Sequence, residues 1–198
     1  MNKPTRIFVH TTAASYQKIP RQFMAVNRWH KERFGTSCRS SLAYYGGYHT
    51  LIEPNGWEGR YREDWENACA VVGWNESALH VALTFDGDIE VPTLKQQKKL
   101  VERILKWSKK YNIKTTDIEF VGPHRLEAPH KTCYGSLLPD DYVVKLIHPV
   151  DKDTEDQEKK DKTEAQKQLL LDQLRMLVLQ LTILVGEYTG LVNKRIKR

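Results

Sequence analysis

A run of charged residues divides this 198-residue chain into two unequal parts. Residues 151–164 read DKDTEDQEKKDKTE and contain no aliphatic or aromatic side chain. A segment of this kind has nothing to bury in a hydrophobic core, so it is expected to form a linker or the solvated start of a helix. The sequence therefore predicts a folded domain over residues 1–150 and a separate C-terminal segment over residues 165–198.

The C-terminal segment has the spacing of a long amphipathic helix. Leucines and one tyrosine recur four and three residues apart, and most of the neighbouring positions are apolar too, which makes the apolar stripe wider than a two-stranded coiled coil requires. We expect this helix to self-associate into a homo-oligomer; the alternatives are docking on the first domain or peripheral contact with an anionic membrane. The positions are Leu170, Leu174, Leu177, Leu181, Leu184, Tyr188 and Leu191, flanked by Leu171, Val178, Val185 and Val192.

The net charge and the N-terminal residues indicate which partners and which compartment to expect. The net charge is +6, which favours an anionic partner such as a cell wall or a membrane surface. No nucleic-acid-binding motif accompanies it, so nucleic acid is not expected as a partner. The first residues, MNKPTRIFVHTT, lack the apolar stretch of a secretory signal peptide. We therefore expect the protein to be made and first held in a cytoplasm.

Three cysteines, Cys38, Cys69 and Cys133, lie far apart in the sequence. Their odd number and wide separation predict no disulfide framework. A thiolate therefore remains available as a metal ligand or as a nucleophile.

Within residues 1–150, short strand patterns alternate with helix patterns. Strands are expected within residues 6–10, 47–56, 79–85 and 117–124, and helices within 19–35 and 92–113. The dipeptide Asn55–Gly56 predicts a turn at the end of the second strand. Thr93 and Gln96 have the spacing of a capping box at the start of the second helix. Leu100, Val101, Ile104, Leu105, Ser108 and Tyr111 are expected to line its buried face. The fold class is therefore α/β, with a mixed central β-sheet flanked by helices and followed by the long C-terminal helix.

His10, His124 and Cys133 form a candidate metal-ligand set. Each histidine ends a predicted strand, and Cys133 follows His124 by nine residues. Two imidazoles and a thiolate suit Zn²⁺ and leave a fourth position for water, as in catalytic zinc sites. From the residues alone, other interpretations stay open: structural histidines, a small buried cysteine, or a cysteine nucleophile with a histidine base.

Several motifs follow one another along the first domain. They are FVHTTAA (8–14), NRWHKERFG (27–35), GYHTLIEPNGWEGR (47–60), GWNESALHVALTF (73–85), PTLKQQKKLVERIL (92–105), VGPHRLE (121–127) and HKTCYG (130–135). In order and spacing they resemble those of zinc-dependent N-acetylmuramoyl-L-alanine amidases, the family that includes the phage amidase-type lysozymes and is similar to the peptidoglycan recognition proteins. The resemblance covers about residues 5–145.

The resemblance implies roles for individual residues. Zinc would be held by His10, His124 and Cys133, and Tyr48 and Lys131 would be the catalytic side chains. A tyrosine can hold the attacking water, and a lysine beside the metal can stabilise the oxyanion. Trp74, Asn75 and His80 are further candidates for contacts with substrate.

The chain departs from the family pattern in a few places. Tyr134 stands where proline is common, and Pro123 precedes the second histidine in place of glycine. His80 occupies a position where a small residue is more common. None of these departures removes a ligand, so they bear on substrate preference and loop shape.

The function expected on this basis is an endolysin-like hydrolase that cleaves the amide between N-acetylmuramic acid and L-alanine in bacterial peptidoglycan. Such an enzyme would stay in the host cytoplasm until another protein gives it access to the wall. The alternatives are a non-catalytic peptidoglycan-binding module of the same fold and a cytoplasmic amidase of cell-wall recycling.

Overall fold

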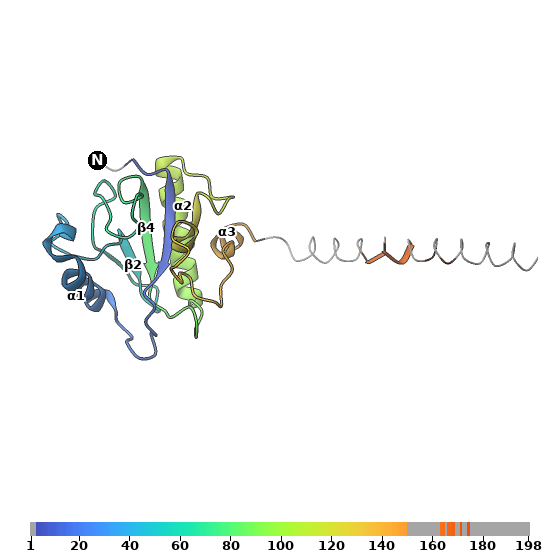
Figure 1. Ribbon diagram of the computed structural model, residues 1–198, viewed down its shortest axis with the longest axis horizontal. Coiled ribbons are helices and arrows are strands. Elements are labelled where there is room, and N and C mark those ends of the chain that lie inside the picture. The colour runs from blue at the N-terminus through green and yellow to red at the C-terminus, as the bar shows by residue number, and fades with distance from the viewer. Residues whose placement is uncertain (1–2, 150–162, 165, 169–170, 172–173, 175–198) are drawn as a thin grey trace, which may run out of the picture. The chain divides into compact units, whose positions relative to one another are not determined.

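The computed structural model describes residues 3–149, 163–164, 166–168, 171 and 174 (Figure 1). The chain divides into two compact units, residues 1–149 and residues 150–198. This division falls beside the charged run that the sequence marks as a linker. Each unit is described by itself.

The first unit is built on a five-stranded sheet with the order β3-β2-β4-β1-β5. Four strands pair in parallel, and β3 runs antiparallel to β2, so the sheet is mixed, as predicted. The predicted turn at Asn55–Gly56 joins β2 to β3, which the sequence did not reveal as a strand. Gly56 has a φ of 85°, a conformation that favours glycine. The strands are β1 (Arg6–Thr11), β2 (Thr50–Ile52), β3 (Glu58–Arg60), β4 (Ala78–Leu83) and β5 (Val121–Pro123).

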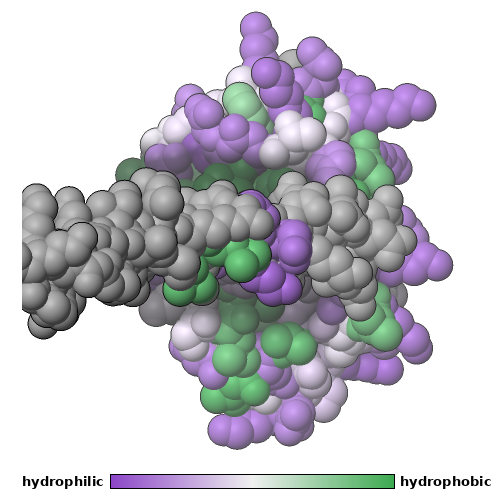
Figure 2. All heavy atoms as spheres, turned by 90° about the vertical axis from the view of Figure 1, so that its right-hand side faces the viewer, coloured by the Kyte–Doolittle hydropathy of each residue, from purple (hydrophilic) through white to green (hydrophobic). Residues whose placement is uncertain are grey.

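Helices cover both faces of this sheet, with α1 (Phe23–Phe34) on one side and α2 (Leu94–Tyr111) with α3 (Tyr142–Ile147) on the other (Figure 1). Two short 3₁₀ turns, Gly35–Cys38 and His124–Leu126, follow α1 and β5. The sequence did not predict α3. On the surface seen from the side of α2 and α3, hydrophilic side chains dominate the edges and smaller apolar areas lie between them (Figure 2).

The first helix begins later than its sequence pattern predicts. It starts at Phe23, so Pro20 precedes the helix instead of occupying its first turn. The Oε1 atom of Glu53, which follows β2, accepts hydrogen bonds from the backbone N–H groups of Gln22 and Phe23, both at 2.8 Å. A carboxylate at a helix N-terminus satisfies free N–H groups and opposes the positive end of the helix dipole. This cap comes from a distant part of the chain.

The second helix begins as predicted. Thr93 and Gln96 form a capping box in which each side chain accepts from the other residue's backbone N–H. Its buried side is shifted from the predicted one: Leu100 and Ile104 are buried together with Trp107, whereas Leu105 is 46% exposed. The predicted stripe was therefore wrong at Leu105, because the sheet contacts the helix along the line that includes Trp107.

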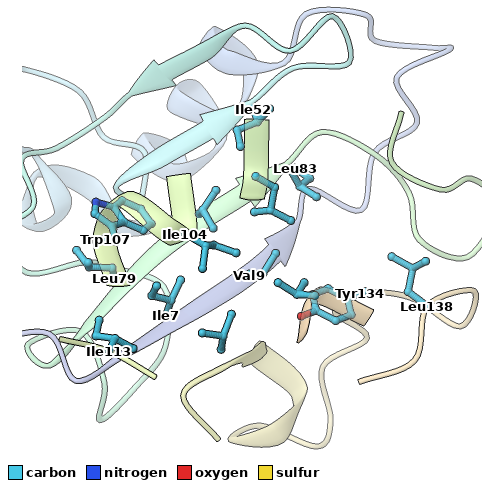
Figure 3. Close-up of a cluster of buried hydrophobic side chains, with 14 of the residues drawn as sticks. Ile7, Val9, Ile52, Leu79, Leu83, Ile104, Trp107, Ile113, Tyr134 and Leu138 are labelled. Atoms are coloured by element: carbon cyan, nitrogen blue, oxygen red, sulfur yellow. The ribbon is translucent and has the colours of Figure 1, made fainter. Parts of the chain in front are cut away.

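Alternation along β1 divides its side chains between two environments. Ile7 and Val9 belong to the main apolar cluster, which also holds Leu79, Ile104 and Trp107 (Figure 3). Phe8 and His10 alternate with them and therefore face the opposite side of the sheet. That second side carries the candidate site.

The second unit is described only at a few positions. Thr163, Glu164, residues 166–168, Leu171 and Leu174 are helical, and the two leucines are 49% and 51% exposed. The rest of the predicted amphipathic helix lies outside the described residues, so its self-association and its membrane contact stay predictions. In the described part of the chain, no helix has the length and apolar character needed to cross a bilayer.

Candidate metal centre and active site

The three candidate ligands converge at one edge of the sheet. His10 lies in β1, His124 directly follows β5, and these strands pair in parallel with Val9 opposite Pro123. Parallel strands end at the same edge, so the pairing brings both imidazoles together. Cys133 returns to them from the loop after β5. One ligand atom from each of the three residues lies within 4.8 Å of the others.

The surroundings of His10 and His124 favour the neutral form of both imidazole rings. Burial lowers the pKa of His10 well below its usual value, and the neighbouring His124 lowers it further. Burial also lowers the pKa of His124 to about 4, with additional lowering from the charges of Lys131 and His130. A neutral imidazole has the free lone pair that a metal requires. At neutral pH, both histidines are therefore in the neutral form that can bind a metal.

The Cys133 thiol lies beside the end of β1. Burial raises its pKa above the usual value, while hydrogen bonds from the backbone and side chain of Thr11 oppose this rise. Thr11 follows His10 directly, so one strand end supplies both a candidate ligand and a hydrogen-bond partner of the sulfur. The sequence did not identify this role for Thr11; its place beside a candidate ligand was the available signal.

The prediction of no disulfide was wrong. Cys38, at the end of a 3₁₀ turn, is bonded to Cys69, and their Cα atoms lie 6.0 Å apart. The two residues are 31 positions apart in the sequence. Distance along the chain sets no limit on distance in space once the loops between α1 and β4 have folded, which is why the inference failed. Cys133 is the remaining free cysteine.

Tyr48 lies between the metal-ligand candidates and α1. Its ring centroid is 4.8 Å from that of His10 and 5.2 Å from that of His30. Burial raises the pKa of Tyr48, and Cys133 raises it further, so the phenol keeps its proton at neutral pH. Nδ1 of His30 accepts a hydrogen bond from the backbone N–H of Gly47 at 2.6 Å, which fixes the segment that carries Tyr48.

Lys131 is part-buried in the loop between His124 and Cys133. Its positive charge helps to lower the pKa values of both residues, so it acts electrostatically on both. No carboxylate in the described part of the chain forms an ion pair with Lys131. The cation is therefore available to a negative charge that develops beside the ligand set. His130, the neighbouring histidine, is exposed.

The three candidate substrate contacts differ in their surroundings. Oδ1 of Asn75 accepts from the backbone N–H groups of Ala70 and Val71 at 2.8 and 3.0 Å, which is a loop-stabilising role. Trp74 is half-buried against Phe8 and lies 4.5 Å from the Arg6 guanidinium. His80 is fully buried. It therefore does not line an open cleft, contrary to the expectation from its place in the motif.

The described residues also line a separate cavity of about 720 Å³ between the start of α1 and the β2–β3 hairpin. None of the candidate ligands or catalytic residues lines it. This cavity and the cluster of reactive side chains are therefore different places. The lining residues are Tyr16, Pro20, Arg21, Phe23, Met24, Glu53, Pro54, Asn55 and Trp57.

A family model described as N-acetylmuramoyl-L-alanine amidase matches residues 1–136. The chain belongs to this family. The match confirms the family expected from the sequence motifs. A search of curated proteins gave no match.

Solved structures of this amidase family and of peptidoglycan recognition proteins share the fold. The amidase LysC from Clostridium intestinale has a TM-score of 0.60 and 23% identity, over 76% of this chain and 88% of that chain. The Ph2119 endolysin from a Thermus scotoductus bacteriophage has a TM-score of 0.57 and 19% identity, over 74% and 86%.

The human recognition protein PGRP-IβC, solved in complex with a glycosamyl muramyl pentapeptide, has a TM-score of 0.57 and 13% identity, over 75% of this chain and 85% of that chain. At these identities the similarity establishes the fold. The candidate site must be argued from this chain's own residues.

Proposed function

We propose that this amidase-family protein is a zinc-dependent peptidoglycan hydrolase with endolysin-like action. It would cleave the amide between the lactyl group of N-acetylmuramic acid and the L-alanine of the stem peptide. The observation that carries the proposal is the convergence of His10, His124 and Cys133, whose ligand atoms lie within 4.8 Å of one another. Lys131 and Tyr48, beside this cluster, support catalysis over binding alone.

The donor set fits Zn²⁺ by its chemistry. Two neutral imidazoles and one thiolate are common zinc ligands, and three protein ligands leave a position open in a tetrahedral site. Zn²⁺ bound there would supply a Lewis acid that polarises a carbonyl and lowers the pKa of water. The other contributions to hydrolysis come from this chain's own side chains.

Lys131 is placed to stabilise negative charge on the carbonyl oxygen of the substrate. Hydrolysis adds water to the lactyl carbonyl carbon, and the oxygen becomes negatively charged before the C–N bond breaks. A fixed cation that is not already paired with a carboxylate stabilises this charge in the transition state. Tyr48 keeps its phenolic proton and lies against His10, so it can orient water by a hydrogen bond.

Mass analysis of digested peptidoglycan tests the bond that is cleaved. The expected products are free stem peptides that begin with L-alanine and glycans whose lactyl groups end in a newly formed carboxylate. Removal of zinc with a chelator should abolish their release, and addition of Zn²⁺ should restore it. A protein that binds peptidoglycan but releases no such peptide with zinc present would be a binding module, and the proposal would be wrong.

Lys131→Ala tests the catalytic role beyond the metal. Loss of one oxyanion-stabilising group costs about 10²- to 10³-fold in kcat, and zinc content should stay at the parent level. Lys106→Ala, on the exposed side of α2, is the matched control and should keep the parent rate. A Lys131→Ala variant that lyses walls at the parent rate would exclude this role.

A further inference from the structure

His80 is a buried histidine that lies directly beside the candidate ligand His10. In the register of β1 and β4, Phe8 lies opposite His80 and His10 opposite Ala82. Residues two apart on a strand share a face, so His10 and His80 are on the same side of the sheet. Nε2 of His10 and Nδ1 of His80 lie 3.1 Å apart, a normal hydrogen-bond distance.

The surroundings of His80 hold its ring in one orientation. The ring stacks on Phe8 at 5.3 Å and on His49 at 5.9 Å between centroids. The backbone N–H of His80 donates to Nδ1 of His49 at 3.1 Å, and the backbone N–H of His49 donates to the His80 carbonyl at 2.9 Å. A fully buried ring with contacts on both faces has little freedom to turn.

The two ring nitrogens of His80 have different neighbours. Nδ1 faces His10, whereas Nε2 is buried without a partner at normal hydrogen-bond length. A proton on Nε2 leaves the lone pair on Nδ1, which then accepts from Nε2–H of His10. The remaining nitrogen of His10, Nδ1, is then unprotonated and free to bind a metal.

We propose that His80 is a positioning residue for the metal site, which accepts a hydrogen bond from His10 Nε2–H and thereby presents His10 Nδ1 to zinc. The inference rests on the metal site in the proposed function and adds a residue to it. Hydrogen bonds of this kind fix the tautomer and the orientation of ligating histidines, and their loss costs about 10- to 100-fold in metal affinity. His80 thus acts through His10 and does not contact substrate.

Two substitutions separate the hydrogen bond from simple packing. His80→Leu keeps an apolar side chain of similar size but removes the acceptor. His80→Asn is smaller but places an amide oxygen near the position of Nδ1. His148→Leu is the matched control, because His148 is exposed and contacts Thr115. Zinc affinity of the full chain would be measured by competition with a chromophoric chelator, and thermal unfolding of the metal-free proteins would report their folding.

The expected result is that His80→Leu weakens zinc binding by about 10- to 100-fold, that His80→Asn recovers most of this loss, and that His148→Leu matches the parent. A folded His80→Leu variant with parent zinc affinity would overturn the inference. If His80→Leu does not fold, ¹H–¹⁵N correlation of the imidazole rings in the metal-free parent decides. The proton of His10 must then reside on Nε2, and a proton on Nδ1 would overturn the inference.

These measurements are independent of the proposed reaction. A parent chain that binds no zinc would defeat the proposed function, while the tautomer measurement would still report on the contact between His10 and His80. A parent chain that binds zinc but cleaves another bond would defeat the proposed substrate and leave the role of His80 intact.

Discussion

The side chains on the two faces of strand β1 are equally buried, but one face has apolar surroundings and the other has polar ones. Ile7 and Val9 face α2 and are fully buried among apolar side chains. Phe8 and His10 face the other side and are 0% and 1% exposed, but there His10 contacts His80, His124 and Tyr48. Stability on the apolar face depends on the volume and shape of the side chains, whereas on the polar face it depends on hydrogen-bond partners for most of the buried nitrogens and oxygens.

The polar face is held together by specific bonds in place of a large apolar cluster. Arg62 is buried and donates to the backbone carbonyls of Cys38 and Gly46 at 3.1 and 2.7 Å. The Cys38–Cys69 disulfide links the same region, and the Cys69 backbone N–H donates to the Gly47 carbonyl at 2.9 Å. These bonds hold the segment that carries Tyr48. Substitutions of the candidate metal ligands on this face should change function more than stability, and substitutions on the α2 face should do the reverse.

The largest effect is expected from Cys133→Ser on the polar face. Serine is a poor zinc ligand compared with a thiolate, so metal binding and wall lysis should be lost together. Metal analysis and a lysis assay would check this. The unfolding free energy of the metal-free variant should remain close to that of the metal-free parent. A Cys133→Ser variant that lyses walls without bound metal would contradict the claim that the polar face acts through a metal.

The matching change on the apolar face is Ile104→Ala in α2. Ile104 is fully buried in the main cluster, and truncation of such a side chain costs about 2–5 kcal/mol of stability. Chemical denaturation would measure the loss, and zinc affinity at a temperature where the variant is folded should equal that of the parent. Leu105→Ala, half-exposed on the same helix, should change stability by about 0.5 kcal/mol or less. Equal losses for the two variants would contradict the assigned helix face.

Removal of the disulfide tests how the polar face is anchored. A cross-link that closes a loop of 31 residues stabilises a protein by about 3–4 kcal/mol through the entropy of the unfolded chain. The double variant Cys38→Ser, Cys69→Ser should lose about this much and keep its zinc. Thiol titration of the denatured, oxidised parent should find one free thiol per chain. Reduction that leaves the stability of the parent unchanged would exclude this contribution.

Acid should lower the stability of the fold through two buried or part-buried histidines. Burial is the main cause that lowers the pKa values of His30 and His49 to about 4, against 6.5 in an unfolded chain. The unfolded state therefore binds more protons between pH 6.5 and pH 4, so stability falls as the pH falls through this range, by about 3 kcal/mol per group.

Denaturation of the metal-free protein at several pH values would measure this slope. The variant His30→Asn keeps an acceptor near the position of Nδ1 but removes one titrating imidazole. Its unfolding free energy should therefore fall less steeply as the pH falls, by the contribution of one histidine. An identical slope would mean that His30 is not held neutral by the fold.

Local patterns predicted much of this molecule. The capping box of Thr93 and Gln96, the Asn55–Gly56 turn and the strand at residues 6–10 depend on residues a few positions apart, and the structure confirms all three. The motifs also placed the chain in its family. The prediction failed at the start of α1, because Glu53 caps that helix from the segment that follows β2. It also missed β3 and α3, which have three and six residues and are too short to show a clear period.

The sequence by itself determined which chemical groups this protein has available: two histidines at strand ends, a cysteine and a lysine in one loop, and a tyrosine before β2. Only the tertiary structure decided which of them meet. Strand register set His80 against His10, loop folding joined Cys38 to Cys69, and the end of β1 brought Thr11 to Cys133. The physical reason is that periodicity along a chain specifies which face a residue takes, whereas its partner depends on how distant segments align.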